Sequence, residues 1–142
     1  SFPTRLSPDL MYEPLAMGGE TSSHSLLSPD AVQNMSRVSA ASHEDATLLI
    51  PTRFSQGFMK TIDNRAREDA VNSSLIISDA AFGHVGAGGS VGFADPDCVM
   101  SFGYAMNRMG TGILMNERGQ NLIDAVYESL GYRGDKSGAW SK

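Results

Sequence analysis

The sequence has one cysteine, no basic excess and no long apolar segment. A single cysteine, Cys98, excludes an internal disulfide and any metal site built from several cysteines. The longest apolar runs, such as Thr47–Pro51 and Leu75–Ile77, fall far short of the roughly 20 residues that span a bilayer. A net charge of −5 without a basic patch argues against nucleic acid or an anionic membrane as partner.

Neither a signal-peptide pattern nor a transmembrane segment is present, so we expect a soluble protein. The compartment stays open, with the cytoplasm favoured. The first residue is Ser1 rather than Met, from which we expect that the native N-terminus lies upstream.

The length of 142 residues and the apolar content of 41% suit one domain with a real core. Three prolines and the pair Gly18-Gly19 predict an irregular segment over residues 1–25. Residues 26–131 hold the periodic segments and are the predicted domain. Residues 132–142 are expected to form a polar tail, from which only Trp140 could dock.

Two segments carry helix signals. Ser28 can cap a helix and Pro29 suits its first position, where no amide hydrogen bond is lost; this helix should end near Arg37. Apolar side chains recur at helical spacing over Gln120–Leu130, and Gly131 is a suitable stop.

Between these helices the pattern favours strands. Arg53–Thr61 alternates loosely and is interpreted as a strand, followed by a loop or short exposed helix over residues 63–72. Val91–Ala94 and Val99–Asn107 read as a β-hairpin turning at Pro96. One face of its second strand has only small or polar residues, which indicates close packing against a helix or another backbone. The order of elements predicts an α+β fold with an antiparallel β-sheet and flanking helices.

The glycine-dense segment Gly83–Gly92 permits three interpretations from its residues. A phosphate-binding loop is disfavoured, because the glycine spacing matches neither known pattern and a hairpin follows. A nucleophile elbow at Ser90 has the right letters but needs a helix after the serine and a later histidine, and both are lacking. The third interpretation is a tight connection between two strands.

A resemblance to a known family adds a fourth interpretation of this segment. The run Phe82–Pro96, with Phe102–Met109 after it, is similar to the C-terminal motif of β-lactamase-like serine hydrolases, the group of class C β-lactamases, penicillin-binding proteins and family VIII-type carboxylesterases. The resemblance extends from about Leu26 to Leu130. Weaker similarities lie at Leu26–Pro29, Thr52–Phe58 and Asp124–Tyr127.

The resemblance implies one wall of an acyl-transfer site. His84-Val85-Gly86 would be the family's His-x-Gly triplet on a sheet strand, and the backbone amide of Ala87 would help to form the oxyanion hole. His84 would lie by the leaving group or a substrate carboxylate. Gly86, Gly88 and Gly89 would let the backbone lie beside the substrate. No metal or organic cofactor is implied.

The family's attacking residues are absent from this sequence. No lysine has a serine three positions before it, so no Ser-x-x-Lys nucleophile motif exists. Tyr127-Glu128-Ser129 matches the family's Tyr-x-Ser element in letters but lies after the triplet, and we interpret Tyr127 as core.

We therefore expect part of a serine hydrolase, an esterase or β-lactamase-like enzyme acting on a small ester, amide or β-lactam through an acyl-serine intermediate. This chain alone should be inactive. It would need the missing N-terminal part of its own domain as partner and should self-associate without it. The alternative is a catalytically inactive β-lactamase-like module for binding or assembly.

Overall fold

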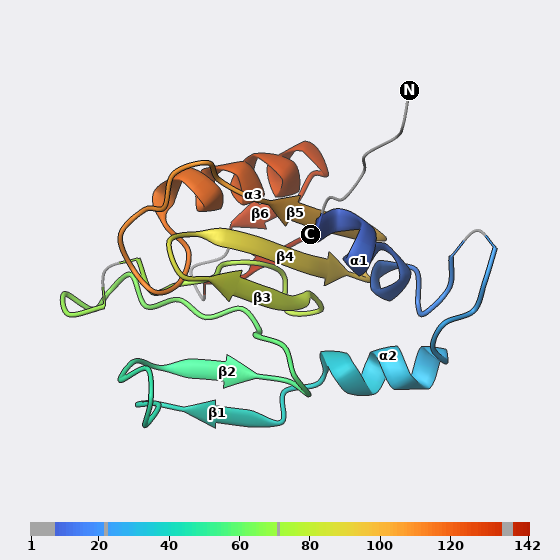
Figure 1. The fold of residues 1–142 in the computed structure, drawn as a ribbon, viewed down its shortest axis with the longest axis horizontal. Coiled ribbons are helices and arrows are strands. Elements are labelled where there is room, and N and C mark those ends of the chain that lie inside the picture. The colour runs from blue at the N-terminus through green and yellow to red at the C-terminus, as the bar shows by residue number, and fades with distance from the viewer. Residues whose placement is uncertain (1–7, 22, 71, 135–137) are drawn as a thin grey trace.

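The computed structural model describes residues 8–142 except residues 22, 71 and 135–137. Its centre is an antiparallel sheet with helices on both faces, which confirms the predicted α+β fold (Figure 1). The elements are α1 (Pro8–Ala16), α2 (Pro29–Ser36), β1 (Ala40–Ser42), β2 (Thr52–Phe54), β3 (Phe82–Gly86), β4 (Ser90–Asp95), β5 (Met100–Tyr104), α3 (Glu117–Ser129), β6 (Arg133–Gly134) and β7 (Trp140–Ser141).

The central strands β3, β4 and β5 follow one another as two hairpins. On β4, Phe93 lies opposite Gly83 of β3 and Phe102 of β5. The predicted β4–β5 hairpin is confirmed, although β5 ends at Tyr104 rather than at Asn107.

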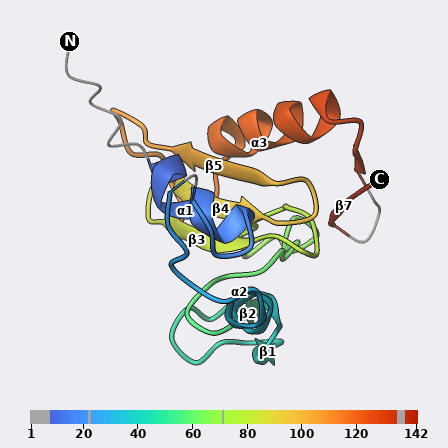
Figure 2. The ribbon, with the colours of Figure 1, turned by 90° about the vertical axis from the view of Figure 1, so that its right-hand side faces the viewer.

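Helix α3 covers one face of this sheet (Figure 2). Alternation places Val85, Val91 and Phe93 on that face, and they join the main core cluster with Ile123 and Tyr127 of α3. The rings of Phe93 and Tyr127 stack with centroids 6.2 Å apart. The predicted periodic helix is therefore confirmed, with its buried stripe formed by the residues that recur at four-residue spacing.

Helix α1 packs against β4 and β5. Ala16 of α1 lies in a second core cluster with Phe82 and Ala94, which belong to the face opposite α3. Ser101 and Gly103 of β5 share this face, so the small residues do admit a helix, as predicted. The expectation of irregular structure over residues 1–25 was wrong for Pro8–Ala16; residues 1–7 lie outside the described part.

The ends of α2 and α3 follow from capping. Ser28 accepts a hydrogen bond from the Ala31 amide (3.2 Å), as predicted for the α2 start. Helix α3 begins three residues before the predicted Gln120, because Asn116 caps it and accepts from the Gly119 amide (3.3 Å). Beyond its end Gly131 adopts φ +78°, which only glycine adopts without strain.

The predicted strand Arg53–Thr61 is wrong in its middle. It breaks after β2 at Gly57, which has φ +86°. The chain then returns, and Met59 bridges both Phe54 and Gly83. This link connects the β1–β2 pair to the free side of β3, and residues 63–72 follow as a loop without regular structure in its described part.

The C-terminal residues are not wholly a polar tail. Trp140 is only 8% exposed, stacks on Tyr127 (centroids 5.6 Å apart) and donates from Nε1 to Asp124 Oδ1 (3.2 Å). Strands β6 and β7 pair beside it, while residues 135–137 lie outside the described part. No helix in the described ranges is long and apolar enough to cross a membrane.

Candidate active site

The open edge of β3 is the first feature of the candidate site. Gly83 exchanges backbone hydrogen bonds with Met59, its amide donating at 3.1 Å and its carbonyl accepting at 2.6 Å. Because backbone groups alternate in direction along a strand, those of Val85 point to the same side, beyond the end of this bridge, and Ala87 lies in the turn that follows β3. Ala87 is exposed, and no group of the described residues accepts a hydrogen bond from its amide. The turn at the end of this edge therefore presents an exposed and open N–H donor.

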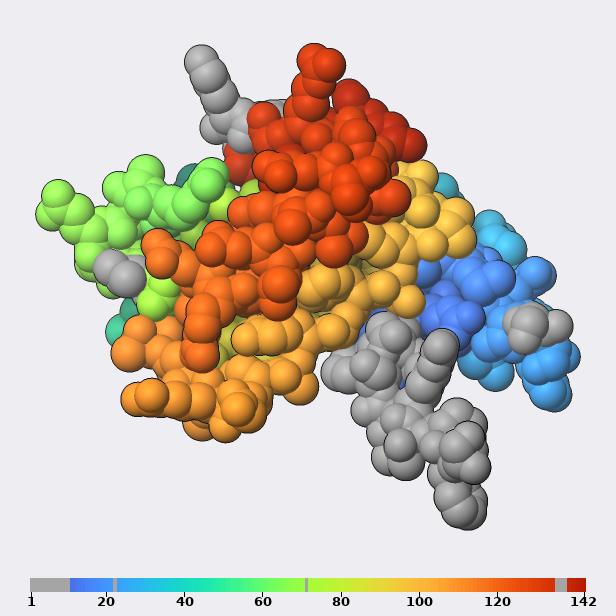
Figure 3. All heavy atoms as spheres, turned by 90° about the horizontal axis from the view of Figure 1, so that it is seen from above, coloured from blue at the N-terminus to red at the C-terminus, as the bar shows by residue number. Residues whose placement is uncertain are grey.

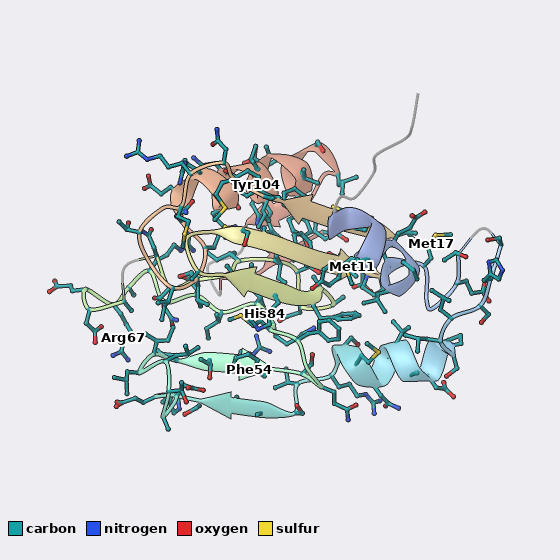
Figure 4. All side chains as sticks on the ribbon, in the orientation of Figure 1. Met11, Met17, Phe54, Arg67, His84 and Tyr104 are labelled. Atoms are coloured by element: carbon teal, nitrogen blue, oxygen red, sulfur yellow. The ribbon has the colours of Figure 1, made fainter. Side chains whose placement is uncertain are left out.

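His84 lies next to this edge with an exposed side chain (Figure 4). Its Nδ1 is 2.9 Å from the carbonyl oxygen of Val85, which can only accept, so Nδ1 carries the proton. In the neutral ring the other nitrogen, Nε2, is then an acceptor. His84 can consequently take a proton at Nε2 and return it, which is the capacity required of an acid–base group.

A shallow hollow of about 380 Å³ adjoins His84 on the α1 side of the sheet. Tyr12 of α1 belongs to its wall; burial raises the pKa of this phenol, and the backbone N–H of His84 partly offsets the rise. The strands that contribute His84 and Tyr104 are separated by β4 (Figure 4). The other residues on the hollow that bear on its chemistry are Gly86, Ser90, Gly92 and Tyr104.

Gly88 and Gly89 lie behind the edge, in the buried turn that joins β3 to β4. The Gly88 carbonyl accepts from the Gly110 amide (2.9 Å) and from Asn116 Nδ2 (2.8 Å). Gly89 has φ +103°, and a side chain there would collide with the Asn116 amide. Both glycines thus hold the turn against Asn116 at the start of α3. Their contact with a substrate stays a prediction.

Two nucleophile candidates within the chain fail on geometry or electrostatics. Ser90 opens strand β4, so no helix follows it and the elbow arrangement is absent. Burial, with Asp95 nearby, raises the pKa of the Cys98 thiol to about 11, so thiolate is scarce near neutral pH. No group of three or more possible His, Cys, Asp or Glu metal ligands occurs in the described residues.

The structure confirms the interpretation of Tyr127 as a core residue. It is fully buried, donates its hydroxyl proton to Asp95 Oδ2 (2.7 Å) and accepts from the Ser78 amide (3.1 Å). Burial, and then the Asp95 charge, raise its pKa. A base must release and take protons near working pH, so this tyrosine has a structural role.

Sequence reasoning missed Tyr12 as a neighbour of His84. It could not have been found, because the helix that carries Tyr12 was not predicted.

No family model matches the chain. Among curated proteins, "Esterase/beta-lactamase LipL" of Mycobacterium tuberculosis (strain ATCC 25618 / H37Rv) is 29% identical over 109 residues, which are 75% of this chain and 22% of that protein. The chain therefore spans less than a quarter of that relative.

Solved structures of similar proteins point to the same group. A family VIII carboxylesterase is 35% identical with a TM-score of 0.67, over 85% of this chain and 30% of that one. A penicillin-binding protein homologue from Caulobacter crescentus is 30% identical with a TM-score of 0.70, over 86% and 30%. EstA from Arthrobacter nitroguajacolicus Rue61a is 27% identical with a TM-score of 0.68, over 87% and 31%. The chain therefore has a β-lactamase-like fold, and the proteins similar to it are named as an esterase/β-lactamase, a carboxylesterase and a penicillin-binding protein homologue.

Proposed function

We propose that this chain supplies one wall of the acyl-transfer site of a serine hydrolase that cleaves a small ester, amide or β-lactam. The observation that carries the proposal is the open amide of Ala87, in the turn that directly follows β3, together with the exposed His84 on that strand. The names of the similar proteins, among them an esterase/β-lactamase and a carboxylesterase, support this class of reaction.

Ala87 would act through its backbone. When a serine hydroxyl attacks the substrate carbonyl, the carbonyl oxygen gains negative charge in the tetrahedral intermediate. An N–H already aimed at that oxygen stabilises the transition state by about 3–4 kcal/mol. The amide of Ala87 meets two conditions for this role, because it is exposed and donates to no described residue. The serine itself must come from outside the 142 residues considered, which contain no Ser-x-x-Lys.

His84 would handle a proton beside the leaving group. Its Nδ1 is held by the Val85 carbonyl, so the ring direction is set and Nε2 is left to act. Gly86 faces the adjoining hollow and leaves room for the substrate, while Gly88 and Gly89 hold the turn that orients the Ala87 amide.

The test is a pair of substitutions at one position in the native protein that contains this chain. Ala87→Pro removes the N–H, and Ala87→Gly keeps it. We expect Ala87→Pro to lower kcat for p-nitrophenyl acetate by about 100-fold or more, and Ala87→Gly to change it only a few-fold. Equal rates in the two variants would refute the oxyanion role of Ala87.

The absence of Ser-x-x-Lys favours the second candidate, an inactive binding or assembly module. The two candidates differ in covalent labelling. A serine-directed fluorophosphonate should label the native protein outside this chain if it is a hydrolase, and should label nothing if it is a binding module. The 142-residue chain alone should not turn over p-nitrophenyl acetate; turnover abolished by Ser90→Ala would overturn the assignment.

A further inference from the structure

One buried asparagine joins three parts of the chain. Asn116 is only 7% exposed and stands at the start of α3, where its Oδ1 accepts from the Gly119 amide. Its Nδ2 donates to the Gly88 carbonyl (2.8 Å), in the turn between β3 and β4. The segment before α3, orange in Figure 3, lies at the surface where the helix begins, and a side chain at its Gly110 would meet the Asn116 amide. Asn116 therefore links the turn, this segment and the helix.

The capping role alone does not require an asparagine. A cap needs only one acceptor oxygen, and Ser28 supplies it at α2 through the same bond from the third following amide. A carboxamide has a donor as well as an acceptor. Asn116 uses this donor on the Gly88 carbonyl, so its side chain has a second role, which concerns the turn.

The turn transmits this contact through rigid peptide units. In a trans peptide the carbonyl of one residue and the N–H of the next lie in one plane and point in opposite directions. The Gly88 carbonyl thus sets the direction of the Gly89 N–H, which donates to the Gly86 carbonyl (3.0 Å). The Gly86 carbonyl in turn shares its plane with the Ala87 N–H. Two peptide planes and one hydrogen bond therefore connect the Asn116 contact to the open amide.

The residues of this turn do not hold its shape by themselves. Gly88 and Gly89 have φ of +86° and +103° and, without a Cβ atom, many other backbone angles are open to them. The Asn116 amide fills the space where a side chain of Gly89 would lie, and the Gly110 amide gives the Gly88 carbonyl a second donor (2.9 Å). An N–H that stabilises a transition state must be aimed before the reaction, so these contacts bear on catalysis.

We propose that Asn116 is a positioning residue that aims the Ala87 N–H at the developing oxyanion through these two peptide planes. The proposal rests on the oxyanion role proposed above for Ala87. Asn116 acts through the turn and does not need to touch the substrate. Because the aim matters only when charge develops on the substrate oxygen, loss of the Asn116 donor lowers kcat and leaves KM nearly unchanged.

The test is Asn116→Asp in the native protein that contains this chain. Aspartate keeps the cap, since it is a preferred capping residue, but it turns an oxygen instead of a donor toward the Gly88 carbonyl. We expect kcat for p-nitrophenyl acetate to fall about 10-fold and KM to change less than about 2-fold. The loss is smaller than for Ala87→Pro, because the Gly110 amide still holds the Gly88 carbonyl. Titration of the reactive serine with a fluorophosphonate counts the active sites, so unfolded protein does not affect kcat.

Asn64→Asp is the matched control. Asn64 is similarly buried (2% exposed), and its Nδ2 donates to the carbonyls of Pro51 and Ser73 (3.1 and 2.8 Å), neither of which belongs to the turn. The control should lose at least as much thermal stability as Asn116→Asp, while its kcat per active site stays within about 2-fold of native. Asn64→Ser replaces it if the aspartate variant does not fold.

A double variant separates positioning from general damage. If Asn116 acts through the Ala87 N–H, Asn116→Asp should have no further effect on kcat once Ala87→Pro has removed that N–H. An equal fall in both backgrounds, or a native kcat in Asn116→Asp beside a large Ala87→Pro effect, would overturn the positioning role and leave the proposed function standing. Equal rates in Ala87→Pro and Ala87→Gly would remove the oxyanion role and this proposal with it.

Discussion

Lys60 is a cation placed in the protein interior. Its side chain is among the largest that are fully buried, and the residue is only 2% exposed. Nζ donates to the Asp79 carbonyl at 2.7 Å. Burial first, and then repulsion by Arg53, lower the pKa of this amine from 10.5 to about 8, against the attraction of Asp79, Asp95 and Asp97. The folded state therefore holds the Lys60 proton less firmly than the unfolded state does.

The sign of the effect on stability follows from linkage. Below about pH 8 both states bind the proton, and keeping the charged amine buried costs the folded state about 3 kcal/mol. Between about pH 8 and 10.5 only the unfolded state stays protonated, so the free energy of unfolding rises with pH. We expect a net rise of about 1 kcal/mol between about pH 8 and 9.5, because the Cys98 thiol, whose pKa is raised to about 11 in the folded state, offsets part of the Lys60 effect above about pH 9. Higher pH is avoided because Tyr132, whose pKa burial raises to about 12, would add to this opposition.

Lys60→Met removes the charge and keeps most of the volume. Removal of the buried charge should raise the free energy of unfolding by about 3 kcal/mol at pH 7. The lost hydrogen bond to the Asp79 carbonyl reduces this gain by about 1 kcal/mol. The variant should therefore be about 2 kcal/mol more stable in urea unfolding at pH 7, and its free energy of unfolding should fall slightly rather than rise between about pH 8 and 9.5, because only the Cys98 effect is left. Lys142→Met, at an exposed position, should keep the native profile. A Lys60→Met protein that is less stable than native at pH 7, with an unchanged pH slope, would refute the reasoning.

Two further predictions concern the packing that orients the site. Tyr127→Phe leaves Asp95 and the Ser78 amide each short of a buried partner, so the free energy of unfolding should fall by about 2 kcal/mol, whereas Tyr104→Phe on the half-buried strand end should change it little. Gly89→Ala combines a strained φ of +103° with displacement of the Asn116 cap and should cost about 2 kcal/mol or more by thermal unfolding. Gly57→Ala, which also has positive φ but meets no atom within 4 Å, should cost about half as much; equal losses would show that the contact with Asn116 is not what matters.

The elements with strong local signals were predictable. Pro96 marks the hairpin turn, and the four-residue spacing of Ile123 and Tyr127 marks α3, because these signals depend only on neighbours in sequence. Helix α1 was not predictable, because Pro8 and Pro14 disfavour a helix locally. It is held by packing of Tyr12 and Leu15 around the Phe82 and Ala94 side chains, which lie far away in sequence.

The position of the candidate site was predictable only in part. The resemblance led to the expectation that His84 lies on a strand, whereas the residues alone also allowed a bare strand connection. What local sequence could not reveal is that the Ala87 amide is open, because this depends on whether a segment distant in sequence lies beside the end of β3, and the bridge of Met59 to this strand is at Gly83. Whether a strand lies at the edge of a sheet depends on how the strands pair, and the residues of the strand alone do not determine this pairing.

The glycines of the segment Gly83–Gly92 are needed for different physical reasons, which composition alone cannot separate. A side chain at Gly83 would strike the backbone of Gly92 and Phe93 on the neighbouring strand, and one at Gly89 would strike the Asn116 cap, so the fold itself requires these two glycines. A side chain at Gly86 would meet only the hydroxyl of Ser90 at close range, and that hydroxyl can rotate away. Gly86 also faces the hollow beside His84. It is therefore the glycine at which a need for smallness would come from the substrate rather than from packing.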